Sequence, residues 1–166
     1  MKRCVHLVLA VLLLVLCCGC KKQTNDIQLP TNFYYRSNPV NYNHSNGVIA
    51  AETREGSGYD QNLEGLIELY LQGPLDVAYL SPFPANVHVE ELVSNDSVLQ
   101  ITLSSNFSNL SGHSLTIACA CLSKTVIDLT QCDTVQISAF ESDLAGNKFI
   151  EMKSDSFLFL DEYTNN

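Results

Sequence analysis

Hydrophobic residues between Asn62 and Pro74 recur with the period of an α-helix. Glu64 and Glu68 fall on the opposite side of the helix that this spacing predicts. Asp60 can cap the helix start, where free backbone N–H groups favour a carboxylate. Gly73 followed by Pro74 ends it, because glycine tolerates a left-handed backbone and proline cannot continue a helix. The apolar positions form one stripe: Leu63, Leu66, Ile67, Tyr70 and Leu71.

A second helix is predicted by the same period nearer the C-terminus. It begins after Ser111 or Ser114, either of which can serve as the N-cap, and runs to about Leu129. Its stripe again recurs every three or four residues: Leu115, Ala118, Cys119, Leu122, Val126 and Leu129.

Alternating patterns predict strands in the rest of the chain. From Ser97 to Leu103, every second residue is a large aliphatic, which indicates one buried face and one more polar face. Residues 75–86 contain two prolines and are predicted to form an extended loop. The expected strands are Phe33–Arg36 paired with Val48–Thr53, Val87–Val93, Ser97–Leu103, Asp133–Glu141, and one or two closing strands at Phe149–Met152 and Ser156–Leu160.

This order of elements predicts an α/β (α+β) fold in a single small domain. Two helices between strand pairs suit a three- or four-stranded mixed sheet with both helices on one face. We therefore expect one common core from both helices and the central strands: Leu66, Ile67, Tyr70, Leu99, Ile101, Leu115, Cys119, Leu122 and Ile137.

The first nineteen residues have the layout of a bacterial lipoprotein signal peptide. A basic start is followed by an apolar stretch, Val5–Leu16, that is shorter than the ~20 residues of a membrane span. Gly19 and Cys20 then fit the last two positions of a lipobox, although Cys17 stands where leucine is usual. We predict lipid attachment at Cys20 and an extracytoplasmic domain anchored to the bacterial cell membrane. An ordinary signal peptide or an uncleaved anchor is the alternative.

The domain boundaries follow from this leader. Residues 1–19 are the signal peptide, residues 20–32 the lipidated cysteine and a polar tether, and residues 33–162 the folded domain. Removal of the signal leaves 7 basic and 18 acidic residues, a formal charge of −11. This charge argues against nucleic acid as a partner and suits a soluble domain held to the membrane by its lipid.

Several segments resemble the GerMN domain of sporulation and spore germination proteins. The run Leu66–Pro74 resembles the family's helix followed by Gly-Pro, and Pro84 with Val87–Val93 its entry into the central hairpin. Leu99–Ser104, Leu122–Val126 and Val135–Ile137 resemble the hairpin's second strand, the second helix and the last core strand; Glu141-Ser142 departs from the usual Asp-Gly. The resemblance implies a non-catalytic domain, similar to the ring-building motifs of sporulation complexes, that mediates assembly in the envelope of Gram-positive bacteria.

The cysteines are the only group with metal-ligand chemistry. Cys119 and Cys121 lie ~200° apart around a helix, so they cannot share one metal. Cys132 and His113 are the other candidate ligands nearby in the sequence, and we predict no metal and no cofactor. Buried free thiols are the expected state, and a bridge from Cys132 to one of the pair is the alternative.

No other pattern predicts a catalytic centre. His88 and Glu90 share a strand face and can hydrogen-bond there, whereas Glu91 points the other way. Gly56-Ser57-Gly58 lacks the Gly-x-Ser-x-Gly spacing of a nucleophile elbow. Four tyrosines could line a glycan or partner surface, although packing in the core is the commoner use: Tyr34, Tyr35, Tyr42 and Tyr59.

The leading hypothesis is therefore a non-catalytic, lipid-anchored envelope protein that acts through contact with envelope proteins or through self-assembly. A lipoprotein that binds cell-wall glycan or a small solute is the alternative, and a hydrolase ranks last. The acidic faces would suit a partner that carries lysine or arginine: Glu64, Glu68, Glu90 and Asp96.

Overall fold

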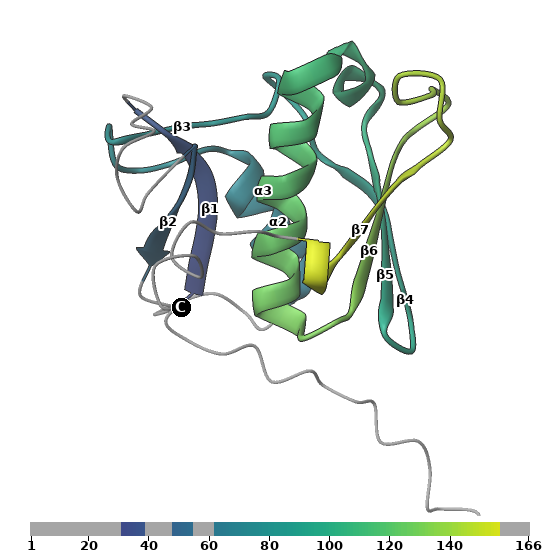
Figure 1. Ribbon diagram of the computed structural model, residues 1–166, viewed down its shortest axis with the longest axis horizontal. Coiled ribbons are helices and arrows are strands. Elements are labelled where there is room, and N and C mark those ends of the chain that lie inside the picture. Colours follow the sequence, from purple (N-terminus) through teal and green to yellow (C-terminus); the bar gives the residue numbers. More distant parts are fainter. Residues whose placement is uncertain (1–30, 39–47, 55–61, 157–166) are drawn as a thin grey trace, which may run out of the picture.

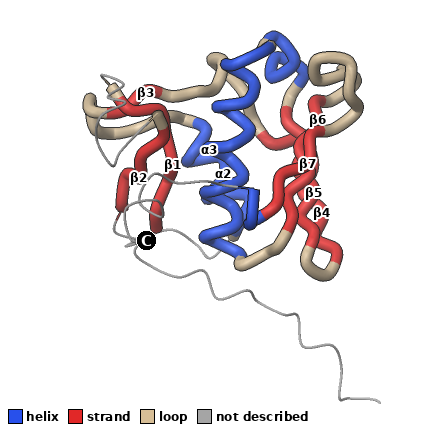
Figure 2. Tube along the Cα trace, in the orientation of Figure 1, coloured by secondary structure: helices blue, strands red, loops and turns tan. Residues whose placement is uncertain are grey.

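The computed structural model describes residues 31–38, 48–54 and 62–156, which form a small α+β domain. Two helices lie between a three-stranded sheet and a four-stranded sheet (Figure 1, Figure 2). The predicted fold class is confirmed, and both helices lie on the same face of the four-stranded sheet.

The three-stranded sheet has the order β2-β1-β3 and is antiparallel throughout. Its strands are β1 (Thr31–Ser37), β2 (Ile49–Arg54) and the two-residue β3 (Tyr79–Leu80). Phe33 and Tyr35 on β1 are fully buried, and both point to the face that packs on the helices. β1 begins within the segment that the sequence pattern assigns to the tether, because Thr31 and Asn32 already pair with β2.

Helix α2 spans Leu63–Leu71, within the predicted range. The N-cap is Asn62, whose side chain accepts from the Glu64 N–H at 3.2 Å. The prediction of Asp60 as the cap was therefore wrong, since the helix begins two residues later than that cap requires, and Asp60 itself lies outside the described residues. Gly73 has φ +103° and ends the helix as predicted.

The four-stranded sheet has the order β4-β5-β6-β7 and is mixed. β4 (Val89–Asn95) and β5 (Val98–Leu103) form a hairpin, β6 (Thr134–Ala139) runs parallel to β5, and β7 (Ile150–Lys153) closes the sheet antiparallel to β6. The aliphatic side chains of β5 and β6 point to the helices, as the alternation predicts. The other face is polar, and Gln100, Gln136 and Glu151 form a hydrogen-bonded row across three strands.

Helix α3 spans Gly112–Thr130 and makes the crossover between the parallel strands β5 and β6. A short 3-10 turn, η1 (Ser105–Asn109), precedes α3 in the sequence. A second one, η2 (Ser154–Ser156), follows β7. Ser111 is the N-cap by backbone geometry, but its side chain makes no capping hydrogen bond. Gln131, at φ +58°, ends α3 in a left-handed conformation.

The nine residues predicted to share a core all belong to one buried cluster, so this prediction is confirmed. Tyr70 on α2 lies at its aromatic centre. Its ring stacks on Phe33, tilts against Tyr35 and meets Phe83 edge-on, with ring centroids 5.5, 4.9 and 5.1 Å apart.

The division into two sheets is where the structure differs from the single predicted sheet. At Tyr34, the edge of β1 that faces away from β2 is closed by side chains of the helices. The Tyr34 N–H donates to Thr125 Oγ1 at 2.9 Å, and the Tyr70 hydroxyl donates to the Tyr34 carbonyl. Because these hydroxyls satisfy the edge, β1 packs against α3 and does not continue the larger sheet.

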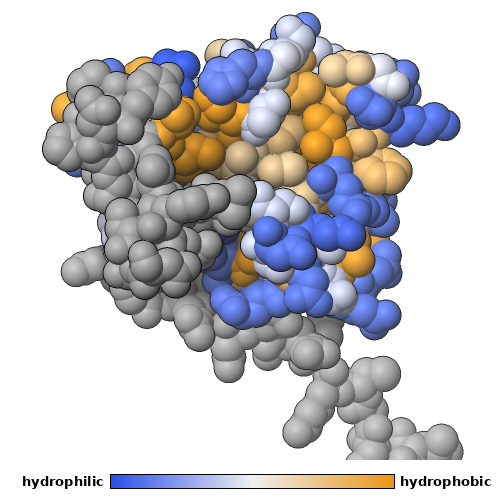
Figure 3. All heavy atoms as spheres, in the orientation of Figure 1, coloured by the Kyte–Doolittle hydropathy of each residue, from blue (hydrophilic) through white to orange (hydrophobic). Residues whose placement is uncertain are grey.

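Figure 3 shows hydrophobic residues gathered over the upper part of α3 in this view, and hydrophilic residues below them. In the described ranges, no helix has the length and hydropathy to cross a membrane.

Candidate interaction surface

The segment that joins α2 to β3 presents its aliphatic side chains to solvent. Leu75 is 80% exposed and Val77 is 88% exposed, the two highest values among the exposed large hydrophobic residues of the described chain. Leu80, at 37%, lies next to them on β3. We call Leu75–Leu80 the apolar loop. Burying either of its first two aliphatic side chains in a partner would be worth ~1.5–3 kcal/mol.

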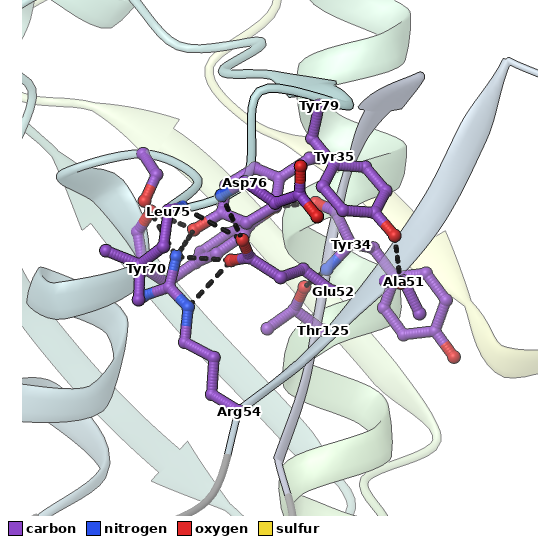
Figure 4. Close-up of polar contacts among 11 residues, drawn as sticks. Tyr34, Tyr35, Ala51, Glu52, Arg54, Tyr70, Leu75, Asp76, Tyr79 and Thr125 are labelled. Carbon is purple, nitrogen blue, oxygen red and sulfur yellow. Dashed lines mark hydrogen bonds and ion pairs between the residues drawn. The ribbon is translucent and has the colours of Figure 1, made fainter. Parts of the chain in front are cut away.

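A buried ion pair beneath this loop fixes its backbone (Figure 4). Glu52 and Arg54 lie two residues apart on β2, so their side chains share a face, and only 8% and 6% of these side chains is exposed. Arg54 Nε donates to Glu52 Oε2 at 2.7 Å. Glu52 Oε1 accepts from the backbone N–H groups of Leu75 and Asp76 at 2.9 and 2.8 Å. The carboxylate therefore holds the loop where the Leu75 side chain leaves the surface.

The guanidinium group of Arg54 completes this anchor. Its Nη2 donates to the Gly73 carbonyl at 2.8 Å and to the Tyr35 hydroxyl at 3.0 Å. The group also lies over the Phe33 ring, 4.7 Å from the centroid. Both buried charges are thus paired and hydrogen-bonded, which is the condition for keeping an ion pair away from water.

Further hydrogen bonds fix the remainder of the apolar loop. Asp76 Oδ1 accepts from the Ala78 N–H at 2.8 Å, and the Asp76 carbonyl accepts from the Tyr79 N–H at 3.1 Å. Asn38, just after β1, donates its side-chain amide to the Val77 carbonyl at 3.1 Å. A loop that is already ordered loses less conformational freedom on binding, so its exposed aliphatic tips suit contact with a partner.

The tyrosines near this anchor serve as hydrogen-bond donors. Burial raises the pKa of Tyr35 and of Tyr70 well above the usual value, so both hydroxyls stay protonated. The Tyr35 hydroxyl donates to the Tyr70 carbonyl at 2.9 Å. Burial, assisted by the hydrogen bond to Asp128, also raises the pKa of Tyr34. Tyr34 and Tyr35 therefore have structural roles, while Tyr42 and Tyr59 lie outside the described residues.

The three cysteines of the domain are free thiols at separate depths. Cys119 and Cys121 are buried in α3, and burial raises the pKa of Cys119 to about 12 and that of Cys121 further. Cys132 is half-buried, and no disulfide joins it to either residue. In the described ranges, no cluster of three or more His, Cys, Asp or Glu could hold a metal ion. His113 is exposed near the start of α3.

His88 and Glu90 form the hydrogen bond that their spacing allows, with His88 Nε2 and Glu90 Oε1 3.0 Å apart. The Asn86 carbonyl, followed by Glu90, raises the pKa of His88. The His88 side chain is 54% exposed, so this is a surface pair. Gly56-Ser57-Gly58 and Cys20 lie outside the described residues.

The acidic face predicted for α2 is only partly free. Glu64 is exposed, but Glu68 turns toward β4 and accepts the Val89 N–H. The expectation of two free carboxylates on this face was therefore wrong for Glu68, because its carboxylate holds β4 against α2.

The apolar loop and its anchor are features that the sequence pattern did not predict. Opposite charges two residues apart on a strand were the available signal for the anchor, since such side chains share a face. Leu75 and Val77 gave no signal, because single aliphatic residues in a loop are ordinary on protein surfaces.

Comparison with solved structures shows which known domains share this fold. The first GerMN domain of the sporulation protein GerM from Bacillus subtilis matches with a TM-score of 0.59 and 16% identity, over 77% of this chain and 99% of that domain. The tandem GerMN domains of the same protein match with a TM-score of 0.55 and 15% identity, over 85% of this chain and 50% of that one. The chain thus has a GerMN-like fold.

No family model matches this sequence. No curated protein matches it either.

Proposed function

We propose that this chain is a non-catalytic, lipid-anchored envelope protein that works by binding another envelope protein through the apolar loop. The observation that carries the proposal is the pair of aliphatic tips at Leu75 and Val77, exposed by 80% and 88% on a backbone fixed by the buried Glu52–Arg54 pair. A surface that is both apolar and ordered is typical of an interaction site.

Two further observations support the envelope setting. The sequence of the first twenty residues has the lipoprotein layout that ends in Cys20. The solved structures that share the fold come from a sporulation protein. We extend the proposal to sporulation or germination on that likeness of fold.

The anchor is tested by replacing Cys20 with alanine. The variant should leave the membrane fraction for the medium or accumulate as an uncleaved precursor, and it should incorporate no labelled palmitate. Continued palmitate labelling of the variant would contradict lipid attachment at Cys20.

The interaction is tested by chemical crosslinking in native membranes. The wild-type chain should form a discrete adduct, and Leu75→Gln combined with Val77→Thr should remove it. Phe149→Gln is the matched control, because Phe149 is an exposed apolar residue, at 50%, on the β6–β7 connection. Turnover of a wall or peptide substrate by the purified chain, abolished by one replacement that leaves it folded, would make the protein an enzyme instead.

A further inference from the structure

A groove of about 320 Å³ lies where the tip of the β4–β5 hairpin meets the first residue of α2 and the last residues of α3. In Figure 1 this hairpin tip and β3 are at opposite ends of the molecule, so the groove is separate from the apolar loop. It is lined by Leu63, Leu92, Ser94, Asp96, Ser97, Leu99, Thr130, Gln131 and Cys132.

The groove has an apolar floor and a polar rim. Leu99 is buried, and Leu63 and Leu92 are half-buried beside it, whereas Ser94, Ser97 and Gln131 are exposed at the edge. Its volume is at the lower end of the ~300–1,000 Å³ of small-molecule sites. Among the described residues that line it there is no aromatic side chain, so these residues offer no platform on which a sugar ring could stack. A single long side chain with an apolar stem fits these walls better than a glycan.

The end of α3 makes the groove electrically negative. The C-terminus of a helix carries about half a negative charge, which a basic residue in the last turn often balances. α3 has no basic residue in its last turn. The carbonyls of Leu129 and Thr130 accept no backbone hydrogen bond from the described residues.

Asp96 adds a full negative charge on the other side of the groove. It is exposed at the hairpin turn, and the ion pairs found among the described residues do not include it. None of the lining residues in the described part of the chain is a lysine or an arginine. The groove thus combines an apolar floor with a carboxylate and a helix C-terminus, neither of which is paired with a cation from the described residues.

We infer that this groove binds the extended cationic side chain of a lysine or arginine from a partner polypeptide. The aliphatic stem lies along Leu63, Leu92 and Leu99, and the charged end reaches Asp96 and the end of α3. Lysine and arginine side chains bury their stems on apolar surface while the charged end stays near water, which matches this distribution of walls. The inference does not rest on the function proposed for the apolar loop.

The test is an NMR titration of the ¹⁵N-labelled full-length chain in detergent micelles. The probes are Nα-acetyl-lysine methylamide, its arginine counterpart, and Nα-acetyl-norleucine methylamide, which has the aliphatic stem but no charge. The two cationic probes should give saturable shifts at the amides of Ser94–Ser97 and Thr130–Cys132. Norleucine should bind at least fivefold more weakly, because one pair of unit charges ~4 Å apart contributes about that factor in water and the end of α3 adds to it.

Asp96→Asn isolates the charge. Asp96 has φ +50°, a conformation that asparagine also tolerates, so the variant keeps the hairpin turn. It should bind the cationic probes about fivefold more weakly and norleucine unchanged. Asp143→Asn, an exposed carboxylate on the β6–β7 connection, is the matched control and should bind like wild type.

The titration needs no partner and no native membrane, so its failure and failure of the crosslinking test are distinguishable. Three results would overturn the inference: no saturable shift up to the solubility limit of the probes, equal affinity for lysine and norleucine, or shifts centred away from the groove.

Discussion

Replacing Arg54 with leucine removes one member of the buried ion pair beneath the apolar loop. Only 6% of the Arg54 side chain is exposed, and its guanidinium group bonds to Glu52, Tyr35 and Gly73. In Arg54→Leu, the Glu52 carboxylate remains buried without its countercharge. Breaking such a pair costs ~3–5 kcal/mol of unfolding free energy.

The structure favours the lower end of that range. Glu52 Oε1 still accepts two backbone N–H groups in the variant, from Leu75 and Asp76, and these bonds offset part of the burial of its charge. We therefore expect a loss of about 3 kcal/mol. A leucine side chain also keeps apolar contact with the Phe33 ring, on which the guanidinium group lies.

Urea denaturation of wild type and variant measures this loss as a change in midpoint at constant m. The matched control is Lys153→Leu, which removes an exposed ion pair with an N–O distance of 3.7 Å. Exposed pairs contribute ~0–1 kcal/mol, so the control should be close to wild type. Hydrogen exchange of the Leu75 and Asp76 amides should also speed up in Arg54→Leu, because Glu52 is less well held. A loss no larger than that of the control would refute the view that this pair anchors the loop.

Three further predictions follow from the core and the titrating groups. Leu66→Ala should lower the free energy of unfolding by ~2–5 kcal/mol through lost burial and a cavity, since Leu66 is 2% exposed; a change under ~1 kcal/mol in urea would contradict its place in the core. Among the three domain thiols, Cys132 should react first with a thiol reagent, and Cys119 and Cys121 only on unfolding, because burial raises the pKa of Cys119 to about 12 and that of Cys121 further; mass spectrometry of labelled peptides decides the order. The pKa of His88 should fall in Glu90→Gln but stay above its ordinary value, because the Asn86 carbonyl, the larger cause of the raised pKa, remains. Since the folded pKa is raised, this pair contributes stability below the unfolded pKa and loses it as pH rises through the folded pKa; an unchanged NMR titration of His88 would contradict the role of Glu90.

Helical period and strand alternation predicted much of the fold because both patterns report burial directly. Leu66, Tyr70 and Leu122 lie in the core because each belongs to the apolar stripe of a helix, and such a stripe packs against the rest of the domain. The helix cap was mispredicted because Asp60 and Asn62 are both good caps, and tertiary packing decides where the first turn forms.

The second sheet and the interaction surface depend on contacts between residues far apart in sequence. Thr125 and Tyr70 close the edge of β1 from 91 and 36 residues away, and no local pattern marks either hydroxyl for that role. β3 has only two residues, too few to show the alternation of apolar and polar residues by which a strand is recognised in a sequence. The exposure of Leu75 and Val77 follows from the Glu52 carboxylate, which binds the loop backbone from another strand.

Site-specific photocrosslinking tests most directly whether the apolar loop is the binding surface. A photoreactive amino acid would replace Val77 in one chain, Leu75 in a second, and Phe149 as a matched control in a third, all expressed in native membranes. We predict one discrete protein adduct from positions 75 and 77 and none from position 149. The yield of that adduct should fall when Arg54→Leu removes the countercharge that holds Glu52, and with it the loop backbone, in place. Absence of an adduct from positions 75 and 77, or the same adducts from all three positions, would contradict the account.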